Sequence, residues 1–232
     1  TRRVLQTADR ILVTNALVPQ CFRQLVDQQT LEKSRVIRHI SPPNQAATEP
    51  EPGWLTHVGS LDPPRCCKPL LRAVHELAQR EPTFQGLRLV GTVNPLFRQQ
   101  ARDVGVEHLI DLVGPVPHEE AQDYTRRSQA LLVIEGDLPI SYFSPSKLAE
   151  YAFHERPIFA VTPSVSTIRS LMNRYPVGAA VAWYDPQFTD KLADFWSRSM
   201  QRSHFTFAGL QHEFSASTNA RLFHEAVCDL TP

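Results

Sequence analysis

Cysteine is scarce in this chain, and what there is does not suggest a metal site. The four cysteines are Cys21, Cys66, Cys67 and Cys228, and no two of them have Cys-x-x-Cys spacing. A structural zinc site usually needs that spacing, so none is expected and no metal ligands are predicted. So few thiols without a pairing pattern indicate a reducing compartment, and we expect a cytoplasmic protein.

Long hydrophobic runs and an excess of charge of one sign are also lacking. No apolar run approaches the roughly 20 residues that cross a bilayer, and we expect neither a transmembrane segment nor a signal peptide. Lysine plus arginine equals aspartate plus glutamate at 24 residues each. The net charge therefore gives no reason to expect a nucleic-acid partner.

Several catalytic signatures are missing as well. The sequence contains no G-x-G-x-x-G, P-loop, G-x-S-x-G or H-E-x-x-H pattern. These patterns mark dinucleotide-dependent dehydrogenases, NTPases, serine hydrolases and zinc proteases. Those four classes have no support in this chain.

Predicted strands and helices alternate over residues 55–200. Short apolar runs such as LRLVG and LLVIE alternate with amphipathic segments of helical spacing. Continuously apolar strands that alternate with helices are typical of a parallel sheet covered on both faces. The predicted fold class is therefore α/β, with a Rossmann-like parallel sheet and helices on both of its faces.

A proline-rich stretch divides the chain. Residues 41–54, SPPNQAATEPEPGW, read as a linker. Residues 1–40 predict a helix, a strand at Ile11–Asn15, a helix at Gln20–Leu31 and a further strand. Residues 55–200 form the main domain, and residues 201–232 a helical tail that should pack across another surface. Because the first residue is Thr1, we expect a fragment of a longer protein.

Candidate ligand-binding residues follow the predicted strands, since ligands of open α/β sheets bind beyond the carboxyl ends of the strands. Gly59 ends one strand, and Arg65 and Lys68 follow in the same loop and helix start. Their side chains can grip phosphate oxygens, although a solvated basic pair fits equally well. Gly114 allows close backbone approach but is also an ordinary turn residue.

The stretch Phe143–Ala160, FSPSKLAEYAFHERPIFA, predicts a short helix after a strand. Ser144 can cap this helix, and Ser146 lies in its first turn. Lys147 and Glu150 share one face. The helix N-terminus and the Lys147 ammonium together favour an anion such as a phosphate, and Glu150 offers a carboxylate to a hydroxyl. An ordinary capped helix before a buried strand is the alternative.

These features together resemble the nucleotide-sugar-binding domain of family 4 of the retaining glycosyltransferases, which have the two-domain GT-B architecture. The segment HVGSLDPPRCCKPLLRA fits the family pattern VGRLxPEKGxxxLLxA without a gap. Arg65 stands where the family has a phosphate-binding lysine. Ser60 stands where it usually has arginine, and Lys68 can replace that contact. The resemblance implies that Val113 and Gly114, after Leu112, face the nucleotide base.

The Phe143–Ala160 stretch is similar to the segment SxxSKLxEYxAxxxPI of some of these enzymes. Glu150 occupies the second of two family glutamates, which binds the ribose hydroxyls. Tyr142 occupies the first position, and Glu155 replaces a glycine before the proline. The catalytic residues that the resemblance implies are Arg65, Lys147 and Glu150, and the binding residues are Gly59, Ser60, Lys68, Val113, Gly114, Ser144 and Ser146.

The activity implied by this resemblance is transfer of a sugar, with retention, from a nucleoside diphosphate sugar to an acceptor hydroxyl. No permanently bound cofactor and no protein-bound metal are implied. The acceptor would be a glycan, a lipid-linked sugar or a small molecule. Residues 1–40 would be the end of an acceptor domain, whose remainder could contact a membrane peripherally. This chain alone would bind a donor without turning it over.

Two other functions remain open. Tyr142 and Ser60, at normally charged positions, suggest a catalytically degenerate GT-B domain that acts as a nucleotide-binding or scaffold module. A GT-B epimerase or phosphorylase-like enzyme would need a catalytic histidine, and no histidine of the sequence can be assigned to that role.

Overall fold

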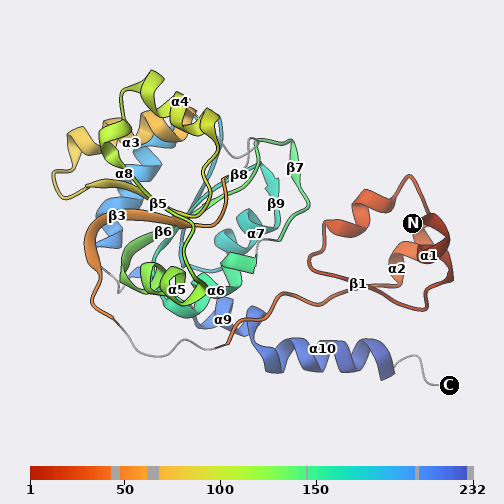
Figure 1. The fold of residues 1–232 in the computed structure, drawn as a ribbon. Helices are drawn as coiled ribbons and strands as arrows, with labels where there is room; N and C mark the ends of the chain where they lie inside the picture. The colour runs from red at the N-terminus through yellow and green to blue at the C-terminus, as the bar shows by residue number, and fades with distance from the viewer. Residues whose placement is uncertain (43–47, 62–67, 145, 202–203, 229–232) are drawn as a thin grey trace.

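A six-stranded parallel sheet forms the centre of the molecule (Figure 1). The computed structural model describes residues 1–42, 48–61, 68–144, 146–201 and 204–228. The strands lie in the order β10-β8-β6-β3-β4-β5, and neighbouring strands are parallel. Their bounds are β3 Glu51–Val58, β4 Gly86–Val90, β5 Ile110–Gly114, β6 Ser128–Ile134, β8 Ile158–Thr162 and β10 Gly178–Ala182.

Helices cover both faces of this sheet. Side chains alternate between the two faces along each strand, so apolar strands present an apolar surface on both sides. On β6, Leu132 and Ile134 point to one face, Leu131 and Val133 point to the other, and all four are buried. The first face packs against α3 Lys68–Arg80, α4 Pro95–Val104 and α8 Phe188–Ser199. The second packs against α5 His118–Arg127, α6 Ser146–His154, α7 Thr167–Arg174 and α9 Ala208–Phe214. The predicted Rossmann-like sheet with helices on both faces is confirmed.

The strand order creates a reversal point between β3 and β6. The chain runs from β3 outward to β4 and β5, with the 3₁₀ helix η3 Glu107–Leu109 before β5, and then returns to β6 on the other side of β3. Ligands of doubly wound sheets bind beyond the carboxyl ends of the strands at such a point. Here those ends are Val58 of β3 and Ile134 of β6.

The linker is shorter than the sequence predicted, because β3 begins at Glu51 rather than after Trp54. Pro52 and Gly53 have the composition of the predicted linker, and Gly53 has a left-handed φ of 96°. The strand continues through this irregularity because the Gly53 N–H donates to Gln129 Oε1 at 2.8 Å, in the buried interior. Glu51 also forms an ion pair with Arg88 of β4.

The N-terminal unit, residues 1–38, has a small core of its own. Its elements are α1 Arg2–Thr7, β1 Ile11–Val13, the 3₁₀ helix η1 Val18–Phe22, α2 Gln28–Glu32 and β2 Ser34–Val36. Strands β1 and β2 pair in parallel over a core that includes Leu5 and Val26. The single helix predicted for Gln20–Leu31 is wrong, because Asp27 caps a new helix there and accepts from the Thr30 N–H at 2.8 Å.

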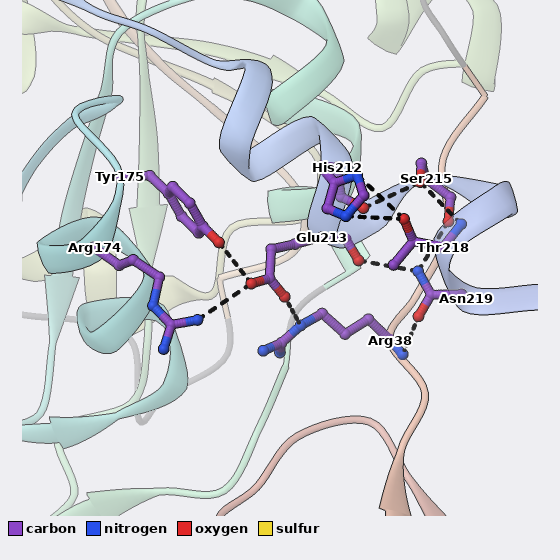
Figure 2. Close-up of polar contacts among 8 residues, drawn as sticks. All are labelled: Arg38, Arg174, Tyr175, His212, Glu213, Ser215, Thr218 and Asn219. Carbon is purple, nitrogen blue, oxygen red and sulfur yellow. Dashed lines mark hydrogen bonds and ion pairs between the residues drawn. The ribbon is translucent and has the colours of Figure 1, made fainter. Parts of the chain in front are cut away.

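A polar junction joins the N-terminal unit to the rest of the chain (Figure 2). The Glu213 carboxylate of α9 accepts from Arg38 Nε at 2.7 Å, from the Tyr175 hydroxyl at 2.6 Å and from Arg174 Nη1 at 3.3 Å. Asn219 of α10, Ala216–Cys228, accepts from the Arg38 N–H at 2.7 Å. Burial alone would raise the pKa of Glu213, but the bonds from Tyr175 and Arg38 lower it below its ordinary value.

The described part of the tail consists of helices α9 and α10, and α9 lies against the main domain. Helix α9 packs on α6, where Gln211 Nε2 donates to the Ala152 carbonyl. Among the described helices, none has the length and apolarity that crossing a membrane requires.

Candidate functional site

Three glycines end the neighbouring strands β3, β4 and β5 on one edge of the sheet. The Gly59 N–H donates to the Val90 carbonyl at 2.8 Å, and the Gly91 N–H donates to the Gly114 carbonyl at 2.9 Å. A Cβ on Gly91 would lie 2.4 Å from the Gly59 carbonyl oxygen, so only glycine fits there. Gly114 has a φ of 83° and open space where a side chain would start. The backbone at this edge is therefore compact at Gly91 and accessible at Gly114.

Helix α6 is attached to the end of β3 by a buried tyrosine. The Val58 N–H donates to the Tyr151 hydroxyl oxygen at 2.9 Å, and Tyr151 is 1% exposed. Burial raises the pKa of this phenol above its ordinary value, so it stays neutral. The hydrogen bond fixes α6 beside the reversal point between β3 and β6.

A polar network lies between α6 and α5. Glu150 Oε2 accepts from Lys147 Nζ at 2.7 Å and from Gln122 Nε2 at 2.7 Å. Gln122 Oε1 in turn lies 2.6 Å from His154 Nε2. The Lys147 and Glu150 side chains are 29% and 22% exposed, so solvent still reaches both charges. A cation and a carboxylate thus share the first turns of a helix near the carboxyl edge of the sheet, where an anion and a hydroxyl group could be held together.

His154 is the histidine of this network, and its pKa is strongly shifted. Burial lowers its pKa to about 4, and the charges of Arg126 and Lys147 act in the same direction, against Glu150. The imidazole is therefore neutral near pH 7. A histidine of this kind contributes a hydrogen bond and no charge.

The remaining predicted residues are only partly brought together. Lys68, at the start of α3, forms an exposed ion pair with Asp103 of α4 at 3.3 Å. It therefore contacts α4 in this structure rather than the Lys147–Glu150 pair. Ser60 is exposed, and Val113 is half-buried. Arg65 lies outside the described residues.

Helix α6 begins at Ser146, which is exposed, and Ser144 is half-buried two residues earlier. The predicted cap depends on Pro145 as the first helical residue, and Pro145 is outside the described residues. Lys147 lies in the first turn of α6, which follows β6 in the chain with the short strand β7 Ile140–Ser141 between them.

Glu155 adopts a backbone conformation that favours glycine. Its φ is 53°, the one left-handed value among the described residues other than glycine. Its side chain accepts from Gln211 Nε2 of α9 at 2.9 Å. The end of α6 therefore keeps the left-handed turn that glycine usually provides, and α9 holds the side chain.

Two features of the site had no clear sequence signal. Glu135, which follows β6, is 3% exposed and accepts from the hydroxyls of Ser141 and Ser166, the first at 2.6 Å. These serines end the short parallel strands β7 Ile140–Ser141 and β9 Val165–Ser166, so Glu135 fixes this pair above the sheet edge. In the sequence Glu135 reads only as the end of an apolar run.

The second unsignalled feature is the contact to the N-terminal unit. Asn15 is fully buried, and its Nδ2 donates to the Tyr142 carbonyl at 2.9 Å, from 127 positions away in the sequence. The turn before α6 is thereby fixed from both sides, by the N-terminal unit and by Glu135. Among the described residues, no group of three or more histidine, cysteine or acidic side chains could hold a metal ion.

Comparison with known proteins gives a match in structure only. No family model matches the sequence, and a search of curated proteins finds no match. The chain superposes on a TarM variant of S. aureus in complex with Fondaparinux, alpha-GlcNAc-glycerol and UDP, with a TM-score of 0.73 and 11% identity. It also superposes on HepE of Anabaena in complex with UDP (0.71, 15%) and on sucrose-phosphate synthase of Thermosynechococcus elongatus (0.68, 17%).

These superpositions cover 97% to 99% of this chain but only 45%, 65% and 60% of the three neighbours. The chain therefore spans about half to two-thirds of the length of the structures that it resembles. At 11% to 17% identity the likeness concerns the fold. The chain has the α/β Rossmann-like fold found in glycosyltransferases of the GT-B architecture.

Proposed function

We propose that this chain is the donor-binding part of a glycosyltransferase that moves a sugar, with retention, from a nucleoside diphosphate sugar to an acceptor hydroxyl. The observation that carries the proposal is the Lys147–Glu150 pair. It lies on the first turns of α6, and Tyr151 attaches this helix to the carboxyl end of β3 at the reversal point. In an α/β sheet this is where a nucleotide is expected to bind.

Each part of the site has a role in this proposal. Lys147, Arg65 and the N-terminus of α6 would stabilise the diphosphate as negative charge builds on it during departure. Glu150 would accept hydrogen bonds from the ribose hydroxyls, and the accessible backbone at Gly114 would face the base. This is electrostatic stabilisation by preorganised donors, and removal of one such donor typically costs about 10²–10³ in rate.

The solved neighbours support a uridine nucleotide as the first choice of donor. TarM, HepE and the pneumococcal O-GlcNAc transferase GtfA have each been solved in complex with UDP. No protein-bound metal is required in this scheme. The acceptor would be bound mainly by a domain that precedes the N-terminal unit, so we expect this chain alone to bind donor without transferring it.

Isothermal titration calorimetry with UDP, GDP and ADP tests the proposal. We expect UDP to bind, and Glu150→Ala to weaken UDP binding about ten-fold, because a charged hydrogen bond to the ribose is lost. Glu119→Ala, which removes an exposed glutamate of α5, is the matched control and should leave the affinity unchanged. Failure of all three nucleotides to bind, or equal binding by wild type and Glu150→Ala, would show that the site is wrongly assigned.

A second function is favoured by a specific observation. Tyr142 stands where the family carries its first glutamate, so the carboxylate of that position is missing in this chain. A degenerate domain that binds nucleotide as a scaffold would look like this. Assay of the full-length protein with a panel of nucleotide sugars separates the two, since measurable sugar transfer excludes the degenerate module.

A further inference from the structure

Gln122 of α5 connects two residues of α6 that lie one helical turn apart. Its Nε2 donates to Glu150 Oε2 at 2.7 Å, and its Oε1 lies 2.6 Å from His154 Nε2. Gln122 is half-buried, and it contacts both residues across the interface between the two helices. It is therefore held at both ends of its amide group.

The chemistry of the partners fixes which way this amide points. A carboxylate can only accept hydrogen bonds, so the NH₂ group of Gln122 has to face Glu150. The Gln122 oxygen then faces His154, which has to carry its proton on Nε2. A buried, neutral imidazole carries one proton, and the tautomer with that proton on Nε2 meets the requirement. A single orientation satisfies all three groups.

Glu150 Oε2 therefore accepts from two donors. A bound diphosphate would attract the charged donor, Lys147, and would not attract the neutral donor, Gln122. Lys147 is the partly exposed cation that an incoming diphosphate would attract. If its ammonium turns to the diphosphate, Gln122 still holds Oε2. Among the described residues no hydrogen bond or ion pair reaches Oε1 of Glu150. That oxygen is available to a ligand hydroxyl.

We propose that Gln122 is a positioning residue that keeps the Glu150 carboxylate aimed at the ribose hydroxyls when Lys147 engages the diphosphate. The inference rests on the proposed function, because it assigns Gln122 a role only if Glu150 binds the nucleotide. His154 acts one step further back, since its Nε2–H fixes the orientation of the Gln122 amide. Neither residue touches the ligand.

The test is UDP affinity of two Gln122 variants as a function of pH. Gln122→Leu removes both hydrogen bonds and should weaken UDP binding about ten-fold at every pH, the loss expected for one charged hydrogen bond. Gln79→Leu is the matched control. Gln79 lies on α3 and also contacts a histidine, His75 at 3.0 Å, and its substitution should not change the affinity.

Gln122→Glu keeps the shape of the side chain and replaces the donor by a second carboxylate. Near pH 8 the two carboxylates repel each other, so UDP binding should be at least ten-fold weaker than in wild type. Near pH 5.5 a shared proton restores a donor toward Glu150, so the variant should approach wild type. Lys147 and Glu150 on α6, His154 on α6 and Arg126 on α5 are the charged and titratable groups that act on this position.

The ratio of variant to wild-type affinity removes the titration of UDP itself from this comparison. A role in packing alone would leave the UDP affinity of both folded Gln122 variants near that of wild type. If Gln122→Leu does not fold, Gln122→Glu carries the test alone. A ratio near one at both pH values, or a ratio that does not change with pH, overturns the inference.

The same experiment distinguishes failure of this inference from failure of the proposed function. If wild type does not bind UDP, or Glu150→Ala binds as well as wild type, the proposed function fails. If Glu150→Ala weakens binding and both Gln122 variants bind like wild type, only the role of Gln122 is wrong.

Discussion

Helices α3 and α6 follow the two central strands of the sheet and differ in what holds them. Helix α3 follows β3 and packs through an apolar face that includes the fully buried Leu71 and Leu77. Helix α6 follows β6 and has buried polar contacts as well, from Tyr151 to β3 and from His154 to α5. A helix that only supports the sheet does not need such groups, because each of them must find a partner in the interior.

The lysines at the starts of these helices show the same difference. Lys68 of α3 forms an ion pair with Asp103, and the two side chains are 46% and 40% exposed. Lys147 of α6 lies in a network of four residues around Glu150. The sequence places both lysines after a central strand, yet of these two only Lys147 contacts a network of polar side chains.

The largest expected effect is on UDP affinity, and it distinguishes Lys147 from Lys68. Lys147→Ala should weaken UDP binding about 10- to 100-fold, because it removes a cation from the proposed diphosphate site. Lys68→Ala should leave the affinity within about two-fold, since an exposed ion pair on another helix contributes little. Calorimetry of the two variants checks this. A larger loss for Lys68→Ala than for Lys147→Ala would move the phosphate site to α3.

Tyr151→Phe tests how α6 is attached to the sheet. The substitution leaves the buried Val58 N–H without its partner, so we expect the free energy of unfolding to fall by about 1–3 kcal/mol. Tyr124→Phe is the control. Its hydroxyl makes no hydrogen bond to a described residue, and we expect a change below about 0.5 kcal/mol.

Urea denaturation measures both of these variants. Equal effects would mean that the Tyr151 hydroxyl does not attach α6 to β3. In that case α6 would be held against β3 by apolar contacts alone.

The smallest expected effect is on the free energy of unfolding, and it concerns the residues that follow the last turns of α4 and α6. Helix α4 ends at Gly105 with a left-handed φ of 78°, whereas α6 ends at Glu155 with a φ of 53°. Asparagine tolerates this conformation better than glutamate, so Glu155→Asn should raise the free energy of unfolding by up to about 1 kcal/mol, less the bond from Gln211. Gly105→Asn should lower it slightly. Destabilisation of the same size in both variants would contradict this account of Glu155.

Most of the fold could be predicted from the sequence, because strands buried on both faces are continuously apolar and helices keep one apolar face. The start of β3 could not, since Pro52 and Gly53 have the composition of a turn and are kept in the sheet by Gln129, 76 positions away. The break between η1 and α2 was detectable from Asp27, an ordinary helix cap, but the apolar spacing across it favoured one helix.

The pairing of Lys147 with Glu150 was predictable, because it depends only on their spacing along one helix. Lys147 and Glu150 follow β6 in a recognisable segment, and the structure pairs them at 2.7 Å. Gln122 and Asn15 were not predictable, because their roles come from side-chain contacts between segments that are distant in sequence. The direction of the Lys68 side chain was unpredictable for the same reason. A position at the start of a helix does not determine which neighbour a long side chain reaches.

The turn before α6 and the first residues of this helix are the proposed binding site for a nucleoside diphosphate. A crystal structure of this chain with UDP tests this claim most directly. We expect diphosphate oxygens about 3 Å from Lys147 Nζ and at the N-terminus of α6, and a ribose hydroxyl that donates to Glu150. UDP bound elsewhere, with Lys147 still paired to Glu150, would contradict the claim.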